Sequence, residues 1–246
     1  MGEADRMVSG SLRLPLAVSR RFYIGISLLI ALMAIVGFWP TYLGPLLVGG
    51  VESPPVIHFH FTIYSGWVAL FVAQSAFAST GQLALHRKLG KIGIYYGFAL
   101  VPVGILTAFV IFAGRVEAGL LEEAQWRLLA PLTDMVLFPI FFGAAVAYRR
   151  KPEIHKRFMV VATTTLLVAA VARMTFLGTP VPSTVFLLIW FLPILMGMVH
   201  DFMTRRLIHP VYVIGLVGLY LLSLRRHAVD TETWLNISAW LVTLVS

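Results

Sequence analysis

Residues 55–79 read PVIHFHFTIYSGWVALFVAQSAFAS, a stretch with two histidines near its start and no Asp, Glu, Lys or Arg. About 20 apolar residues in a helix are enough to cross the ~30 Å hydrocarbon core of a bilayer. Ser53 is suited to cap such a helix, and Pro54 and Pro55 are suited to its entrance. The stretch therefore predicts a membrane-spanning helix that begins at Pro55 and ends near Ser79.

Similar hydrophobic stretches follow one another along the chain, with short polar connections between them. Of the 246 residues, 59% are hydrophobic and 12% are charged, whereas a soluble domain has about 25% charged residues. The sequence thus predicts an all-α, polytopic membrane helix bundle with about seven transmembrane helices. The expected spans are Phe22–Leu47, Pro55–Ser79, Ile92–Gly114, Leu128–Tyr148, Phe158–Gly178, Ser183–Met203 and Pro210–Leu224.

The basic residues favour one orientation of this bundle. Fourteen of the 19 Lys and Arg residues fall on the side of the N-terminus, four fall on the other side, and Arg173 lies inside a span. Cytoplasmic connections of membrane proteins carry an excess of Lys and Arg. We therefore expect residues 1–21 to form a basic cytoplasmic tail, residues 22–225 a seven-span membrane domain, and residues 226–246 a C-terminal segment on the outer side.

The final residues, Trp234–Ser246, are apolar but too few to cross a bilayer. They predict a short interfacial helix with Trp234 and Trp240 as anchors, or a segment that docks on a partner in a membrane complex. The lipid bilayer is the other expected partner. Without a basic low-complexity run or a soluble domain, the positive charge does not indicate a nucleic-acid partner.

The chain contains no cysteine, which excludes disulfides, thiolate-bound zinc, iron–sulfur clusters and covalently attached c-type haem. It has no P-loop, GxGxxG or GxSxG motif, so nothing supports a nucleotide site. A retinal protein of the rhodopsin type is excluded as well, because the seventh span holds no lysine for a Schiff base.

Polar residues near the outer ends of three spans predict a first candidate site. Each helical residue advances about 1.5 Å, which places His60, Asp134 and Arg173 at nearly one depth. Charges inside a bilayer are costly and usually pair with one another or face water. We expect these three residues to form an outer polar cluster, with Tyr64 and His58 nearby. Such a cluster could be a structural salt bridge, a pore or substrate site, or a metal or cofactor site.

A second set of candidates lies at the inner surface: His86, His155, His200 and His209. Neutral imidazole suits zinc, iron and copper, so the four could bind a metal or cofactor. Interfacial histidines also cap helices and meet lipid headgroups, and no HxxxH or HExxH spacing occurs here. His86 and His155 recur in a weak internal repeat, ALHRKLGKIG and EIHKRFMVVA, at the entrances of the third and fifth spans.

Segments 58–93 and 155–174 together resemble a group of uncharacterised bacterial membrane proteins. That group carries a histidine at the head of one span, an apolar run that ends in Gln, then HRxLG, and later HKRxM with a downstream Arg. The resemblance covers about half of the chain, implies the bacterial inner membrane as the location, and implies no activity. The matching residues are His60, Gln74, His86, Arg87, Gly90, His155, Lys156, Arg157, Met159 and Arg173.

A fainter similarity, through His86, Leu89 and Gly90, links the chain to dihaem b-type cytochromes, in which HxxLG marks a haem-ligating helix. Three functions remain open. The first is a binding or accessory subunit of a membrane complex, built around the outer cluster and requiring no cofactor. The second is a membrane redox protein that binds b-type haem or a divalent metal through histidines. The third is a zinc-dependent intramembrane hydrolase with Asp201 as its acid–base. The intramembrane charges are compatible with the first two functions, and we prefer the first by a small margin.

Overall fold

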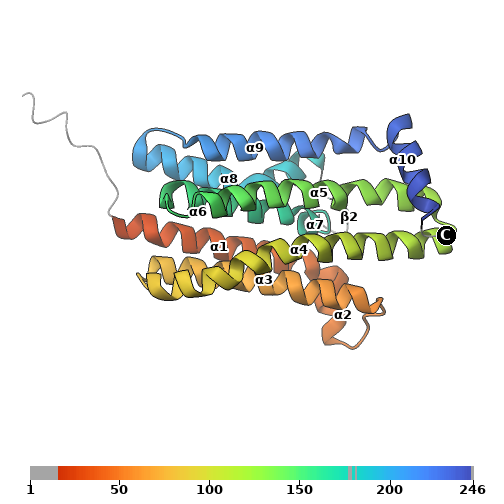
Figure 1. The fold of residues 1–246 in the computed structure, drawn as a ribbon, viewed down its shortest axis with the longest axis horizontal. Helices are drawn as coiled ribbons and strands as arrows, with labels where there is room; N and C mark the ends of the chain where they lie inside the picture. The colour runs from red at the N-terminus through yellow and green to blue at the C-terminus, as the bar shows by residue number, and fades with distance from the viewer. Residues whose placement is uncertain (1–15, 177–178, 181, 245–246) are drawn as a thin grey trace, which may run out of the picture.

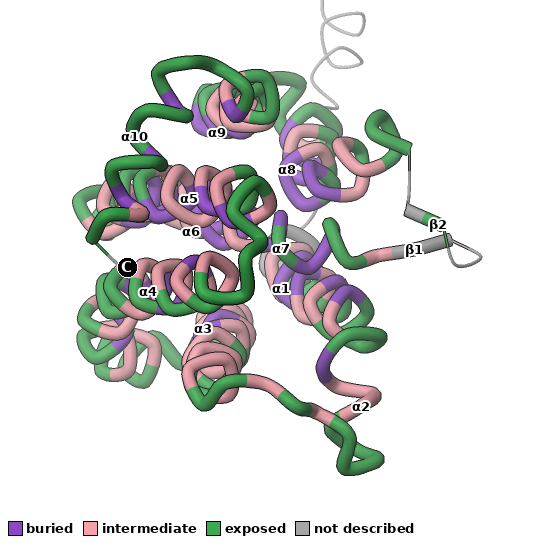
Figure 2. The backbone as a smooth tube through the Cα atoms, turned by 90° about the vertical axis from the view of Figure 1, so that its right-hand side faces the viewer, coloured by how far each residue is buried: buried purple, intermediate pink, exposed green. Residues whose placement is uncertain are grey.

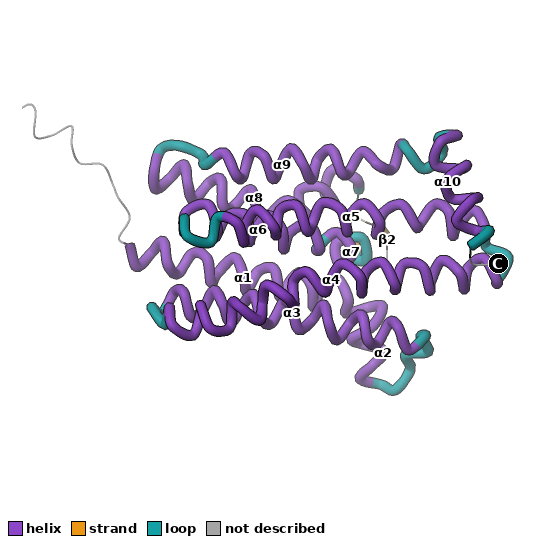
Figure 3. Tube along the Cα trace, in the orientation of Figure 1, coloured by secondary structure: helices purple, strands orange, loops and turns teal. Residues whose placement is uncertain are grey.

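The computed structural model describes residues 16–176, 179–180 and 182–244. The first 15 residues of the expected tail, Gly178 at the end of the expected fifth span, and Ser246 lie outside the described residues. Helices dominate, and most run along one common axis (Figure 1, Figure 3). The elements are α1 Leu16–Phe38, the π-helix η1 Trp39–Leu43, α2 Gly44–Leu47, α3 Pro55–Ser79, α4 Leu83–Glu117, α5 Leu121–Ala147, α6 Pro152–Leu166, α7 Val168–Val171, β1 Thr175–Phe176, β2 Thr179–Pro180, α8 Ser183–Arg205, α9 Pro210–Ser223, the 3₁₀-helix η2 Leu224–His227, and α10 Glu232–Val242.

The expected membrane helix bundle is confirmed. Six helical segments in the described part of the chain are long and apolar enough to cross a membrane. The expected seventh span, α9, has 14 residues and is about 21 Å long at 1.5 Å per residue. It lies beside α5, α6 and α8 (Figure 1), so the expectation of about seven helices is close. The short C-terminal helix is present as α10.

Four of these helices begin earlier than the hydrophobic pattern predicted. α1 begins at Leu16 instead of Phe22, within the expected tail, and α5 begins at Leu121 instead of Leu128. α4 begins at Leu83 instead of Ile92, and α6 begins at Pro152 instead of Phe158. The predicted starts excluded the basic residues, but Lys and Arg are good helix formers whose long side chains reach water from the membrane edge. As a result, His86 and His155 lie on helices, each at the fourth residue of its own.

The expected fifth span is interrupted. α6 ends at Leu166, the short α7 follows, and a small antiparallel hairpin of β1 and β2 completes the segment. The Trp190 indole N–H donates to the Thr164 carbonyl oxygen at 2.9 Å, and Thr165 donates to the Val161 carbonyl oxygen at 3.2 Å. Such side-chain contacts to carbonyl oxygens near a helix end accompany a bend or break.

Buried residues face the interior between the helices, and exposed residues face outward (Figure 2). The largest fully buried side chains include Trp190 and Tyr212. Arg157 is buried among them although it carries a charge. We call one end of the bundle the basic end: α1, α4, α6 and α9 begin there, and α3, α5 and α8 end there (Figure 1). Arg157 and all four histidines of the second candidate set lie toward this end.

Gly37 allows α1 to approach α7 closely, because a Cβ at this position would overlap the backbone carbonyl of Ala170. Small residues permit such contacts between membrane helices. We expect Gly37→Ala to destabilise the protein by about 1–3 kcal/mol, since backbone atoms cannot move aside cheaply. Gly25→Ala on the same helix is the matched control, because a Cβ there meets nothing within 4 Å. Thermal unfolding in detergent measures both; equal melting temperatures would contradict the prediction.

Candidate functional site

A buried ion pair joins α6 to α8 at the basic end. The Arg157 guanidinium donates to both carboxylate oxygens of Asp201, with Nε 2.8 Å from Oδ2 and a second short contact from Nη2 to Oδ1. Neither residue has exposed surface. Two parallel N–H···O bonds of this kind fix the geometry as well as the charge. The pair therefore sets the position of α8 against α6.

Glu153, one turn before Arg157 on α6, extends this pair into an ionic cluster. It accepts from Arg157 Nη1 at 2.9 Å and from Lys156 Nζ at 2.8 Å, and it also pairs with Arg205 at the end of α8. The cluster thus contains three cations and two carboxylates. Every charged group in it has an opposite partner, and the Arg157 guanidinium donates from all three of its nitrogens.

His209 and two tyrosines complete the surroundings of the cluster. The His209 backbone N–H donates to Asp201 Oδ2 at 3.3 Å, and its ring Nδ1 accepts from the Val211 N–H at 3.2 Å, which caps α9. Burial and the nearby charge of Arg157 lower the pKa of His209, so its ring is neutral and able to accept this bond at pH 7. Tyr212 Oη lies 3.4 Å from Tyr23 Oη, which ties α9 to α1.

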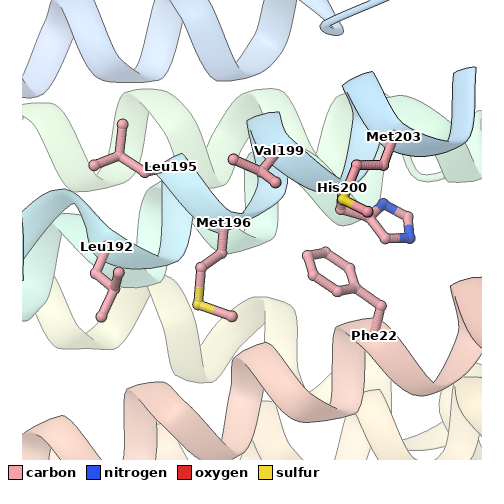
Figure 4. Close-up of a pocket in the computed structure, with 7 residues that line it drawn as sticks. All are labelled: Phe22, Leu192, Leu195, Met196, Val199, His200 and Met203. Carbon is pink, nitrogen blue, oxygen red and sulfur yellow. The ribbon is translucent and has the colours of Figure 1, made fainter. Parts of the chain in front are cut away.

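Beside the ionic cluster, a groove of about 350 Å³ lies between α1 and α8. Its residues on α8 recur at spacings of three and four, which is one face of a helix. Figure 4 shows Leu192 and Met196 along this face, with Phe22 of α1 opposite. All lining residues except one are apolar: Phe22, Leu192, Leu195, Met196, Val199, His200 and Met203.

His200 is the polar residue of this groove. It is 9% exposed, and its ring is stacked on Phe22 with centroids 3.8 Å apart, as Figure 4 shows. Neither ring nitrogen has a hydrogen-bond partner, and Nδ1 lies 3.9 Å from Asp201 Oδ1, which is too long for a hydrogen bond. Both nitrogens are themselves buried, so a ligand in the groove would reach them only after a side chain beside His200 moved.

The other two histidines of the predicted inner set form a separate pair. The ring of His86 on α4 and the ring of His155 on α6 have centroids 6.4 Å apart and nearly perpendicular planes. His200 and His209 belong instead to the groove and to the α9 cap, so the four histidines do not share one centre. Among the residues that the structure describes, no group of three or more His, Cys, Asp or Glu side chains could hold a metal ion.

The predicted outer cluster is divided among several contacts in the structure. Asp134 pairs with Arg225 of η2 rather than with Arg173, whose Nη1 donates to the Ala169 carbonyl oxygen at 2.6 Å and whose guanidinium lies over the Phe38 ring. Arg225 also donates to Thr133 Oγ1 at 2.8 Å. The sequence predicted that Arg225 lies just outside the last span. In the structure it belongs to η2, which follows α9, and it reaches Asp134.

The histidines of that outer set have different partners. His58 Nδ1 lies 2.7 Å from Tyr42 Oη, whereas the His60 ring is stacked on the Tyr64 ring with centroids 4.1 Å apart. Tyr64 donates from Oη to the Leu100 carbonyl oxygen at 2.9 Å. His58 and His60 therefore face different neighbours, as residues two apart on a helix do.

The sequence did not predict the Arg157–Asp201 pair or the groove. Arg157 stood among basic residues expected at the membrane surface, and its neighbours in sequence gave no sign of burial. Asp201 was the available signal, because an acidic residue near the end of an apolar helix needs a partner. No protein-family model, curated protein or solved structure matches this chain.

Proposed function

We propose that this integral membrane protein binds a neutral, lipid-soluble molecule in the groove between α1 and α8, with the polar head of that molecule against His200. The observation that carries the proposal is the buried imidazole whose two nitrogens have no partner. A buried polar group without a hydrogen bond costs about 1–3 kcal/mol, and such groups are rare in folded proteins. A bound head group with a carbonyl or hydroxyl would satisfy His200.

The shape of the groove supports a lipid-soluble ligand. Its residues on α8 extend over about 16 Å, from Leu192 to Met203, at 1.5 Å per residue. Val199 and Met203 are more than half exposed, so the groove opens at the outer surface of the bundle, where lipid would lie. Its walls are apolar, as those of small-molecule sites mostly are, and His200 is the one lining residue that carries polar atoms.

The charges around the groove support a neutral head group. Arg157, whose partner Asp201 adjoins His200 in sequence, is already paired with two carboxylates, Asp201 and Glu153. No Lys or Arg is among the described residues that line the groove. A carboxylate or phosphate there would lose its hydration without gaining a counter-charge.

The basic end fits the cytoplasmic face of a bacterial inner membrane, because it gathers most of the Lys and Arg residues. His200 then lies at the inner leaflet, within reach of lipid-soluble molecules that diffuse in the bilayer. The sequence predicted a binding role for the outer His–Asp–Arg cluster. We propose that role for the groove instead, at the opposite end of the bundle. The protein would act as a binding or accessory component of the membrane.

We expect the purified protein to bind decylubiquinone, a neutral quinone with a short apolar tail, more tightly than the anion laurate. His200→Leu keeps the volume but removes both polar atoms, and it should weaken quinone binding about tenfold, the equivalent of one hydrogen bond. Val199→Trp should abolish binding by filling the groove. Isothermal titration calorimetry in mild detergent measures each affinity.

Val217→Trp is the matched control, because Val217 is a half-exposed residue of α9 away from the groove. It should leave quinone binding unchanged. Equal affinity of wild type and His200→Leu would show that the imidazole takes no part. Tighter binding of laurate than of the quinone would overturn the neutral-ligand proposal.

A further inference from the structure

Two helical hairpins of this fold are built alike at the basic end. One consists of α3 and α4, and the other of α5 and α6. His86 and His155 are each the fourth residue of the second helix in their hairpin. His86 Nδ1 lies 3.2 Å from the Gln74 carbonyl oxygen of α3, and His155 Nδ1 lies 2.8 Å from the Ala145 carbonyl oxygen of α5.

These contacts fix the tautomer of both rings. A carbonyl oxygen only accepts, so each Nδ1 must carry the proton and donate it. In the neutral ring, Nε2 then holds a lone pair. A histidine that donates one ring N–H to a carbonyl while the other nitrogen stays basic is the arrangement that orients histidines for metal binding in proteins.

The spacing of the two rings suits one shared metal. Two metal–nitrogen bonds of about 2 Å, together with the distance from each nitrogen to its ring centre, separate the ring centres by about 6 Å. The observed separation is 6.4 Å, with the planes at 83°. A metal bound end-on by two imidazoles leaves each ring free to rotate about its bond, so perpendicular planes are compatible with ligation.

We infer that His86 and His155 together bind one transition-metal centre through their Nε2 atoms. The site lies between the two hairpins and shares no residue with the groove at α1 and α8. Its repeated construction is the observation that carries the inference. One imidazole with a carbonyl partner is a common structural contact, whereas two in equivalent positions, with ring centroids 6.4 Å apart, could act together as a pair of ligands.

The donor set selects the kind of metal. With two imidazoles and no third His, Cys, Asp or Glu in the described residues near them, the pair does not complete the four-ligand shell of a structural zinc site. It suits a metal that needs only two protein ligands: a cuprous ion, or an iron whose other four ligands come from a haem. Imidazole is a good ligand for both copper and iron.

The surroundings offer a further polar group. Gln74 Oε1 is buried without a hydrogen-bond partner, and the side chain of Gln74 lies against Gly90 of α4, where a Cβ would be 3.2 Å from Nε2 of the amide. Arg87 and Lys88 follow His86 directly. The positive charges of Arg87 and Lys88 would attract the propionates of a haem. They would repel a cuprous ion, which is itself positively charged.

The test titrates purified protein with two probes in separate arms: cuprous ion under anaerobic conditions against a chromophoric chelator, and haemin followed by its absorption spectrum. We expect one equivalent of one probe to bind. His86→Asn and His155→Asn are the decisive variants, because the Asn amide can still donate to the carbonyl in place of Nδ1 while Nε2 is lost. Each should weaken binding about a hundredfold or more, and circular dichroism should confirm an unchanged fold.

His58→Asn is the control, since His58 lies on α3 near the opposite end of the bundle and contacts Tyr42. It should bind the probe as wild type does. Binding of neither probe would overturn the inference, and so would equal binding by the double variant His86→Asn/His155→Asn. His200→Leu should leave this site intact, so failure of the quinone proposal and failure of the metal inference can be told apart.

Discussion

Replacing Asp201 by Ala is expected to cost the protein about 3–5 kcal/mol of unfolding free energy, the usual penalty for breaking a buried ion pair by removing one partner. Arg157 would keep Glu153 as its one carboxylate partner and would remain without exposed surface. A guanidinium cannot lose its proton near neutral pH, so the charge cannot be relieved. Unfolding in mixed micelles, followed by circular dichroism, measures the loss.

The same pair gives a sharper comparison through pH and through a double substitution. Arg157→Met leaves a carboxylate that can take up a proton, so its destabilisation should shrink on acidification, whereas that of Asp201→Ala should not. Arg157→Met/Asp201→Leu replaces both charges by apolar groups and should recover most of the loss. A loss below about 1 kcal/mol for Asp201→Ala, or no recovery in the double variant, would contradict a stabilising role for the pair.

The membrane helices could be predicted from the sequence because hydrophobicity over about 20 residues is a local property. The residues from Pro55 to Ser79 form a helix with the predicted bounds. The boundaries failed where local composition was ambiguous. α4 begins before Ile92 and includes the basic residues that the prediction excluded. α6 ends at Leu166, after a run of threonines that the prediction placed inside a longer span.

The partners of the polar residues could not be predicted in the same way. Arg157 and Asp201 are 44 residues apart, and Asp134 and Arg225 are 91 residues apart. The estimated depth in the membrane put Asp134 and Arg173 at one level. Arg225 lies at that level as well, and the packing of the helices decides which cation pairs with Asp134. Similarly, the stripe from Leu192 to Met203 has the same spacing whether it faces lipid, a neighbouring helix or a groove.

Replacing Arg225 by Ala is expected to cost about 2–3 kcal/mol, less than Asp201→Ala because the Arg225 and Asp134 side chains keep 14% and 11% of their surface exposed. Arg225 joins η2 to α5 through Asp134, Thr133 and the Ala130 carbonyl oxygen. Its loss leaves the Asp134 carboxylate buried without a cation. The unfolding measurement used for Asp201→Ala reports this change.

The consequence should extend to α10, which begins at Glu232 and is separated from η2 by four residues. Trp234 of α10 donates from its indole N–H to the Gln125 carbonyl oxygen of α5 at 3.0 Å and is 7% exposed. If Arg225 holds this end of the chain on α5, Arg225→Ala should increase the exposure of Trp234 to an aqueous fluorescence quencher. Arg225→Lys keeps the charge and should preserve part of the protection. Unchanged quenching in Arg225→Ala would show that the contacts of α10 with α5 hold it in place independently of the ion pair.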